Sequence, residues 1–208
     1  MSNETTKTTA IHRISRRLPF VLAIGAAALM VAPASGMAKS AQFGADVDPT
    51  VQPSNAGTAH DCEVAPGEKC TWILNDAYGD PGNEGAPKEG TLKRIELIAG
   101  EAGSFKLQTA KVKADGSAKV RENGPKISYQ GQPESFDEPY NVESFKVDVP
   151  VKKGDYLAIR TASTSTLRCS SGGDNTLLFA PPLSPGGPFE TPSDGEGCWL
   201  LIQGTVKY

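Results

Sequence analysis

The sequence is poor in the side chains on which most catalytic and metal sites depend. It has 2 histidines and 4 cysteines in 208 residues, and no two cysteines have the Cys-x-x-Cys spacing of a zinc site. A Cys-His pair or a Ser-His-Asp triad in the exported part of the chain would have to use His60. This residue stands in a polar stretch, SNAGTAHDCE (54–63), which is a poor place to hold a general base. The sequence therefore predicts a protein that is not an enzyme.

A sustained helical pattern and a strongly basic charge are also missing. No stretch repeats apolar residues with a 3.6-residue period over three turns, and 22 glycines and 16 prolines interrupt the chain throughout. The net charge is −3, with cations and acids interspersed, so we do not expect nucleic acid or anionic lipid as a partner. The length suits one domain with a sizeable core.

Residues 1–38 have the three parts of a secretory signal peptide. A cationic stretch (7–17) precedes the apolar run LPFVLAIGAAALMVA (18–32), and small residues then offer cleavage after Ala34 or after Ala38. The piece SRRLPF leaves a twin-arginine and a Sec export route open. The alternative is an uncleaved membrane anchor. Because the apolar run is shorter than the roughly 20 residues of a spanning helix, we expect a secreted or cell-surface protein with no membrane span after cleavage.

All four cysteines, Cys62, Cys70, Cys169 and Cys198, follow the predicted signal peptide. An even number of cysteines in an exported chain indicates disulfide bonds rather than metal ligands or a reactive thiol. Three pairings are open, and Cys62–Cys70 with Cys169–Cys198 is the most economical, because DCEVAPGEKC is a small loop closed around a Pro-Gly turn. The second bridge would stabilise the fold by roughly 3–4 kcal/mol on the chain-entropy model.

Residues 39–61 are small, polar and unpatterned, and we expect them to form a flexible leader. From Cys62 onward the pattern is one of short strands and turns, which predicts an all-β antiparallel sandwich over residues 62–208. The apolar or alternating segments expected to be strands are 70–74, 91–99, 104–112, 126–130, 142–151, 155–162, 175–180 and 198–208.

Turn signals separate several of these segments: Asp-Gly at 115–116, Asn-Gly at 123–124 and KKGD at 152–155. The combination FKVDVPVKKGDYLAIRT (145–161) resembles the strand–turn–strand found late in jelly-roll domains. CWLLIQGTVKY (198–208) is typical of their closing strand, which lies deep in the sheet beside the beginning of the domain. The chain is also similar to uncharacterised secreted β-sandwich proteins of actinobacterial type. This resemblance implies a jelly-roll-like fold and secretion, and it brings no catalytic motif.

A candidate metal site lies in the loop NDAYGDPGNEGAPKEG (75–90). Asp76, Asp80, Asn83 and Glu84 offer oxygen ligands, of which calcium takes six to eight. Their order does not match the helix–loop–helix calcium pattern, so a solvated turn is the alternative. Calcium is the only cofactor we expect the chain to bind, if it binds one.

A candidate ligand site lies in the loop ISYQGQPESFDEPYN (127–141). Carbohydrate-binding sandwiches stack aromatic rings on sugar faces and bond the hydroxyls with amides and carboxylates, and this loop has both kinds of side chain. The alternative is that the rings fold inward, which the strand-end position of Tyr129 favours. The residues we expect to contact a ligand are Tyr129, Gln130, Gln132, Phe136 and Tyr140.

A third candidate is the loop FAPPLSPGGPFETPSDGEG (179–197), which is rich in proline and glycine. A loop of this length in a small domain is often functional, and Phe189 would be presented to a ligand at its tip. The alternative is a flap that covers one end of the sandwich. Trp72 and Trp199 stand within apolar strands, and we expect both in the core.

These features predict a secreted, non-catalytic module that binds carbohydrate or a cell-envelope polymer through its strand-end loops. One alternative is a structural or protein-binding module of the cell surface. Another is a glycan-processing enzyme, which would need two carboxylates facing each other across a cleft. Asp137 and Glu138, with Glu134 or Glu143, are neighbours in sequence only.

Overall fold

The computed structural model of the chain describes residues 38–47, 56–60, 62, 69–75, 84–100, 102–132, 141–162 and 167–208. These residues belong to one unit, Met37–Tyr208, and of the predicted signal peptide (1–38) only Ala38 is among them. Every regular element in this part of the chain is a strand, which confirms the all-β prediction. The same part contains no helix long and apolar enough to cross a membrane.

Eleven strands are present in the described ranges. They are β1 (Ser40–Gly44), β2 (Ala56–His60), β3 (Lys69–Leu74), β4 (Gly90–Leu97), β5 (Gly103–Val112), β6 (Ala118–Tyr129), β7 (Glu143–Val151), β8 (Tyr156–Ala162), β9 (Leu167–Phe179), β10 (Asp194–Leu200) and β11 (Ile202–Lys207).

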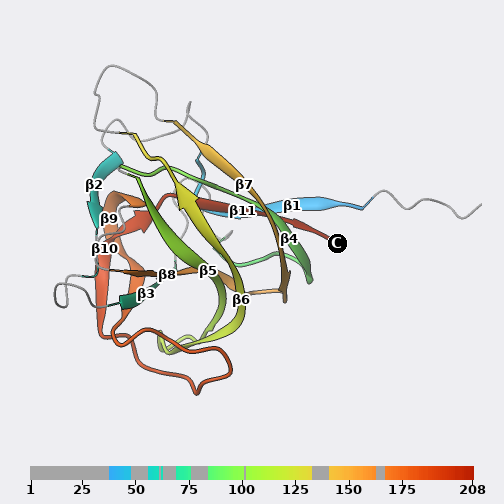
Figure 1. Cartoon of the computed structure of the whole chain (residues 1–208). Helices are drawn as coiled ribbons and strands as arrows, with labels where there is room; N and C mark the ends of the chain where they lie inside the picture. Colours follow the sequence, from blue (N-terminus) through green and yellow to red (C-terminus); the bar gives the residue numbers. More distant parts are fainter. Residues whose placement is uncertain are drawn as a thin grey trace, which may run out of the picture. The chain divides into compact units, whose positions relative to one another are not determined.

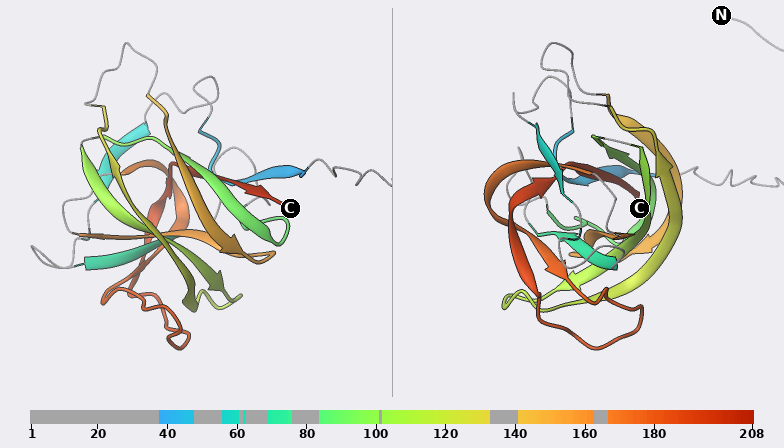
Figure 2. Two further views of the ribbon diagram at one scale, coloured as in Figure 1. Left: turned by 45° about the vertical axis from the view of Figure 1, so that its right-hand side comes forward. Right: turned by 60° about the vertical axis from the view of Figure 1, so that its left-hand side comes forward.

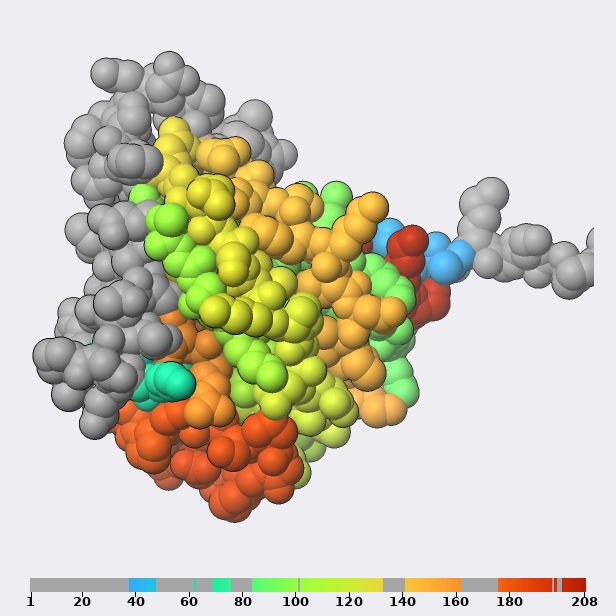
Figure 3. Space-filling view, in the orientation of Figure 1, coloured from blue at the N-terminus to red at the C-terminus, as the bar shows by residue number. Residues whose placement is uncertain are grey.

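The strands form two antiparallel sheets that enclose a core between them (Figures 1 and 2). The smaller sheet has the order β1-β11-β4-β7. The larger has the order β10-β9-β3-β8-β5-β6, with β2 also paired to β9. At one side of the molecule β6 and β7 run side by side, although they belong to different sheets (Figures 1 and 3). Because two sheets enclose one core, the fold is sandwich-like.

Alternation of apolar and polar residues decides which face of each strand is buried. In β4, Ile95 and Leu97 are fully buried, whereas Arg94 and Glu96 point away from the core. A bulge between Leu92 and Arg94 brings Leu92 to the buried face as well. Trp72 of β3 is also buried, as its apolar surroundings predict. The side chain of Trp199 lies outside the described part of the molecule.

The prediction of a flexible leader over residues 39–61 is wrong for residues 40–44, which form β1, and for residues 56–60, which form β2. β1 pairs along its length with β11, and Phe43 is fully buried in the core. β1 thereby covers one edge of β11, whose backbone groups would otherwise be unpaired on that side. Its pattern of one large apolar residue among small and polar ones is too short to indicate a strand. The domain therefore begins before Cys62.

The prediction of a turn at Asn123-Gly124 is also wrong, because β6 continues through it. Lys106 of β5 opposes Lys126 and Gln108 opposes Asn123, so Gly124 and Pro125 together oppose one residue of β5. This is a β-bulge on an edge strand of the larger sheet, and both features allow a proline without an N–H. A side chain at Gly124 would lie 2.9 Å from Val149 Cγ2, so glycine also allows β7 to approach closely.

The Asp115-Gly116 hairpin joins β5 to β6 as predicted, with Gly116 at φ 79°. The Asp115 carboxylate accepts hydrogen bonds from the Ser117 hydroxyl (2.7 Å) and the Ser117 N–H (2.9 Å), which lower the pKa of Asp115. At KKGD the chain instead turns from β7 in one sheet to β8 in the other. The prediction of a turn at both places is confirmed.

Asp155 fixes this second turn from inside, since it is only 1% exposed. Its Oδ2 accepts a hydrogen bond from the Lys152 N–H at 2.8 Å, and Oδ1 lies 2.9 Å from Arg121 Nε. The contact with Arg121 is an ion pair without the alignment of a hydrogen bond. Burial raises the pKa of Asp155 above its ordinary value, against the lowering effect of these two partners.

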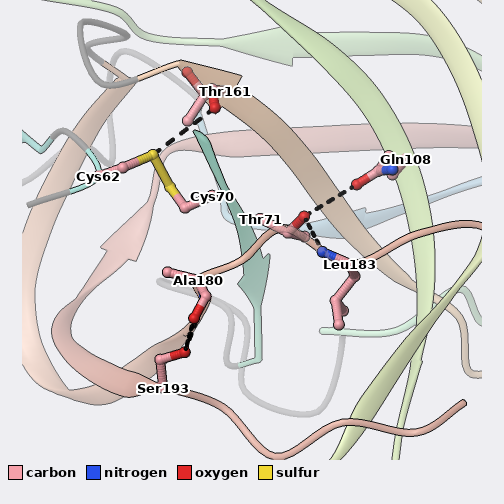
Figure 4. Close-up of a disulfide and its surroundings, with 8 residues drawn as sticks. All are labelled: Cys62, Cys70, Thr71, Gln108, Thr161, Ala180, Leu183 and Ser193. Carbon is pink, nitrogen blue, oxygen red and sulfur yellow. Dashed lines mark hydrogen bonds between the residues drawn. A yellow bond between two sulfur atoms is a disulfide. The ribbon is translucent and has the colours of Figure 1, made fainter. Parts of the chain in front are cut away.

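The predicted Cys62–Cys70 disulfide is present, with the two Cα atoms 5.7 Å apart (Figure 4). Cys169 and Cys198 lie on the paired strands β9 and β10, where Cys198 opposes Ser171 and Cys169 opposes Leu200. The two backbones are thus diagonal neighbours, but their side chains lie outside the described part of the chain. The second bridge stays a prediction.

The predicted closing strand 198–208 is divided between the two sheets. β10 extends the larger sheet, and after Leu201 β11 runs between β1 and β4 in the smaller one. The prediction that the last strand lies deep in a sheet beside the beginning of the domain is confirmed for β11.

Candidate functional site

The outer face of the smaller sheet carries an open, polar groove of about 490 Å³. Its walls come from strands far apart in sequence, because β11 lies between β1 and β4. The lining residues are Gln42, Asp46, Val47, Arg94, Glu96, Val142 and Gln203.

Strand register sets these side chains beside one another. Gln203 of β11 opposes Glu96 of β4, and Thr205 opposes both Gln42 and Arg94. Arg94 and Glu96 form an ion pair of 3.3 Å, with 46% and 20% of their side chains exposed. An ion pair this open to water contributes little stability, so both groups can exchange partners with a ligand at small cost.

Thr205, which lies between the lining residues Gln42 and Arg94 in the sheet, adds an unusual feature. Its Oγ1 is buried and has no hydrogen-bond partner in the structure. Buried polar atoms are normally paired, and an exception calls for a physical explanation such as a bound solvent molecule or ligand. The hydroxyl lies in the same register row as Gln42 and Arg94, which have polar groups that a ligand would also use.

The predicted ligand loop begins and ends beside the groove. Val142 lines the groove, and the next residue, Glu143, accepts hydrogen bonds from the backbone N–H groups of Gln130 (3.0 Å) and Gly131 (2.8 Å). Gln132 Oε1 accepts a further bond from the Asn141 N–H at 2.6 Å. The two ends of segment 133–140 are therefore fastened to each other next to Val142.

The predicted ligand residues of this loop differ in how far they are exposed. Tyr129 is only 2% exposed and packs against Phe105, with the ring centroids 5.8 Å apart, so it offers no face to a ligand. Its place on the inner face of β6 is the inward orientation that a strand end favours. Gln130 is exposed and Gln132 is half-buried. Phe136 and Tyr140 lie outside the described residues.

Phe189 is half-buried rather than presented at a loop tip. Lys113 Nζ lies 4.0 Å and Lys119 Nζ 5.0 Å from the centre of its ring, so two cations of the β5–β6 hairpin contact the ring. The adjacent Glu190 exchanges two backbone hydrogen bonds of 2.9 Å with Ala118. Phe189 thus helps to fasten the loop, and its contact with a ligand stays a prediction.

The long loop that contains Phe189 is a flap over the outer face of the larger sheet (Figures 1 and 4). Leu183 is 1% exposed and packs in a second apolar cluster with Ile73, Leu177 and Phe179. The Leu183 N–H donates to Thr71 Oγ1 at 3.1 Å. The alternative of a covering flap is therefore the one observed, over a sheet face rather than an end.

Half of the predicted calcium loop (76–83) lies outside the described residues, which include Glu84 but not Asp76, Asp80 or Asn83. The part of the chain that is described contains no cluster of three His, Cys, Asp or Glu side chains that could hold a metal ion. Burial, and then the charge of Glu84, raise the pKa of Tyr156. A calcium site at this loop stays a prediction.

Sequence reasoning missed the groove on the smaller sheet. Alternation does indicate that Gln42, Arg94 and Gln203 point outward, but many exposed residues have that pattern. Only the pairing of β1 and β4 with β11 brings these three side chains together, and no local signal encodes that pairing.

Comparisons with known proteins identify no relative: no family model, no curated protein and no solved structure matches the chain. The function is therefore argued from the geometry of the sites alone.

Proposed function

We propose that the chain is a secreted, non-catalytic module of jelly-roll type that binds a polysaccharide along the outer face of the smaller sheet. The observation that carries this proposal is the groove with Gln42, Gln203, Arg94 and Glu96 along its walls. Amide side chains both donate and accept hydrogen bonds, as sugar hydroxyls do, and the charged pair supplies stronger bonds of each kind.

The strand order supports the jelly-roll assignment. β1, β11, β4 and β7 make one four-stranded sheet, and β3, β8, β5 and β6 are consecutive in the other. A jelly roll consists of eight strands in two sheets, with connections that repeatedly cross between the sheets. In this interpretation β2, β9 and β10 are additions beside β3.

The binding mode follows from the shape of the groove, which is open and polar. An extended sugar polymer would lie across β1, β11 and β4, with its hydroxyls bonded to the amides and to the Arg94–Glu96 pair. A contribution of Phe136 and Tyr140, which lie outside the described residues, stays a prediction. Of the carboxylates that a glycan-processing enzyme would use, Glu143 is the one among the described residues. It already accepts hydrogen bonds from two backbone N–H groups, which favours a binding role over a catalytic one.

A module that binds another protein is less well supported. Such surfaces usually expose a contiguous apolar patch. Among the described residues, Tyr208 is the only large apolar side chain that is exposed, at 43%. The polar groove therefore favours a hydroxyl-rich ligand.

The test is retention of the full chain on neutral insoluble polysaccharides and on purified cell walls. We expect Gln42→Ala and Gln203→Ala to weaken retention several-fold with unchanged thermal stability. Lys146→Ala is the matched control, because it removes an exposed side chain of the same sheet outside the groove. Equal effects of all three variants, or no retention of the unaltered chain on any matrix, would refute this function.

A further inference from the structure

A second groove, of about 390 Å³, lies on the outer face of the larger sheet and differs from the first in charge. Four of its lining residues are cations, and none is an acid. The lining residues are Lys69, Ser104, Phe105, Lys106, Lys126, Arg160 and Thr161.

Register explains why these cations gather. Lys106 of β5 opposes Arg160 of β8 on one side and Lys126 of β6 on the other. Neighbouring strands lie about 4.8 Å apart, so the three side chains form one row across three strands. Thr71 of β3 opposes Arg160 at the end of this row, and Lys69, two residues away on β3, lies diagonally beside Arg160. We call Lys69, Lys106, Lys126 and Arg160 the basic row.

The basic row has no acidic partner within the described part of the chain. The ion pairs described there use other cations, Lys93, Arg94, Arg121 and Lys152. Like charges directly opposite each other on a sheet destabilise it. The arrangement is also unexpected in a chain with a net charge of −3. The repulsion between these cations lowers the stability of the sheet, and binding of an anion would explain why the row is nevertheless present.

The flap leaves this end of the sheet open. It covers the apolar cluster around Ile73 and Leu183, and its last contact towards the row is the bond from Leu183 to Thr71. Thr71 in turn donates to Gln108 Oε1 at 3.4 Å, and Gln108 Nε2 donates to Asn123 Oδ1 at 2.8 Å. Figure 4 shows the bonds of Thr71 with Leu183 and Gln108, which lie between the covered apolar cluster and the basic row.

We propose that the basic row binds an acidic polysaccharide through its carboxylate or sulfate groups. A polymer with a charge on each sugar matches a linear row of cations better than a single small anion does. Nucleic acid is less favoured, because single strands are held by stacking on exposed aromatic rings, and Phe105 is only 2% exposed. The site is separate from the groove on the smaller sheet and stands without it.

The test measures binding of the full chain to polygalacturonate and to dextran sulfate, with neutral dextran, a single-stranded oligonucleotide and phosphatidylglycerol vesicles as comparison ligands. We expect binding to at least one acidic polysaccharide and none to dextran. Added salt should weaken it, because the contacts are ionic. The double variant Lys106→Gln/Lys126→Gln should bind at least about tenfold more weakly, which is the loss of one charged hydrogen bond or more.

The matched control is Lys146→Gln/Lys207→Gln, which removes the same charge from exposed positions of the other sheet. It should bind within about twofold of the unaltered chain. Equal losses in the two double variants would show non-specific attraction and overturn the proposal, as would binding to neither acidic polysaccharide. Tighter binding to the oligonucleotide or to the vesicles would overturn the ligand class.

The two proposals can fail separately. Loss of acidic-polysaccharide binding in the Lys106→Gln/Lys126→Gln variant, with retention on neutral matrices unchanged, would support the basic row whatever the outcome for Gln42 and Gln203. The double variant should also unfold at a higher temperature than the unaltered chain at low salt, since it relieves repulsion between cations.

Discussion

The replacement Phe43→Ala tests whether the chain before Cys62 belongs to the folded domain. Phe43 is fully buried, and its ring lies over Gly204 of β11, where an added Cβ would stand 3.0 Å from Phe43 Cε1. Because Gly204 has no side chain that could move into the space, the cavity would stay open. Removing a buried phenylalanine costs about 3–5 kcal/mol, and we expect the upper part of that range.

A loss of about 4 kcal/mol is a large part of the 5–15 kcal/mol by which domains are usually stable. For a domain of this size it corresponds to a fall in Tm of about 8–16 °C. Urea unfolding followed by tryptophan fluorescence gives the free energy directly, and Trp72 in the core reports on it. If Phe43→Ala does not fold, Phe43→Leu should show a smaller loss in the same direction.

The control is Gln42→Ala, the exposed neighbour on the same strand, which should change the free energy of unfolding by less than about 0.5 kcal/mol. A flexible leader would predict the same small change for Phe43→Ala. A result within about 0.5 kcal/mol of the unaltered chain would therefore refute the inclusion of β1 in the smaller sheet.

Three further predictions concern stability. Replacing Cys62 and Cys70 with serine should cost about 2.5 kcal/mol in urea unfolding, given their separation of 8 residues; a change under about 0.5 kcal/mol would contradict the entropic argument. Asp155 binds its proton more tightly in the folded state, so its contribution to stability falls as the pH rises through its raised pKa. The Tm of Asp155→Asn should not show this decrease with rising pH. Equal slopes of Tm against pH for the variant and the unaltered chain would contradict the prediction. Thr205→Val should be neutral or stabilising by up to about 1 kcal/mol in thermal unfolding, because its buried hydroxyl is unpaired; a clear loss would show a hidden partner.

Local signals in the sequence predicted much of the fold. The alternation of apolar Ile95 and Leu97 with polar Arg94 and Glu96 indicates a strand with one buried face, and Asp115-Gly116 indicates a hairpin. The short loop from Cys62 to Cys70 indicates its own disulfide. Each of these features depends on residues within about ten positions of one another, which is the range over which a sequence pattern is informative.

Features that depend on distant pairing could not be predicted in this way. β1 is a strand because β11, at the other end of the domain, pairs with it. The groove on the smaller sheet needs the same pairing to bring Gln42 beside Thr205. Outward-pointing polar residues are expected on every solvated face, so alternation alone does not distinguish a binding face from an ordinary one.

The Asn123-Gly124 dipeptide, which was predicted to form a turn, explains both the burial of Tyr129 and the position of the basic row. If β6 continued in the register of Gln108 and Asn123, Phe105 would oppose Lys126, and a lysine would point into the core. The bulge at Gly124-Pro125 moves the register by one residue, so that Phe105 opposes Ile127 and Lys106 opposes Lys126. The same shift buries Tyr129, which alternates with Ile127 on the inner face, and completes the basic row on the outer face. An Asn-Gly sequence that signals a turn in isolation thus removes a predicted ligand residue from the surface and creates the binding surface that we propose.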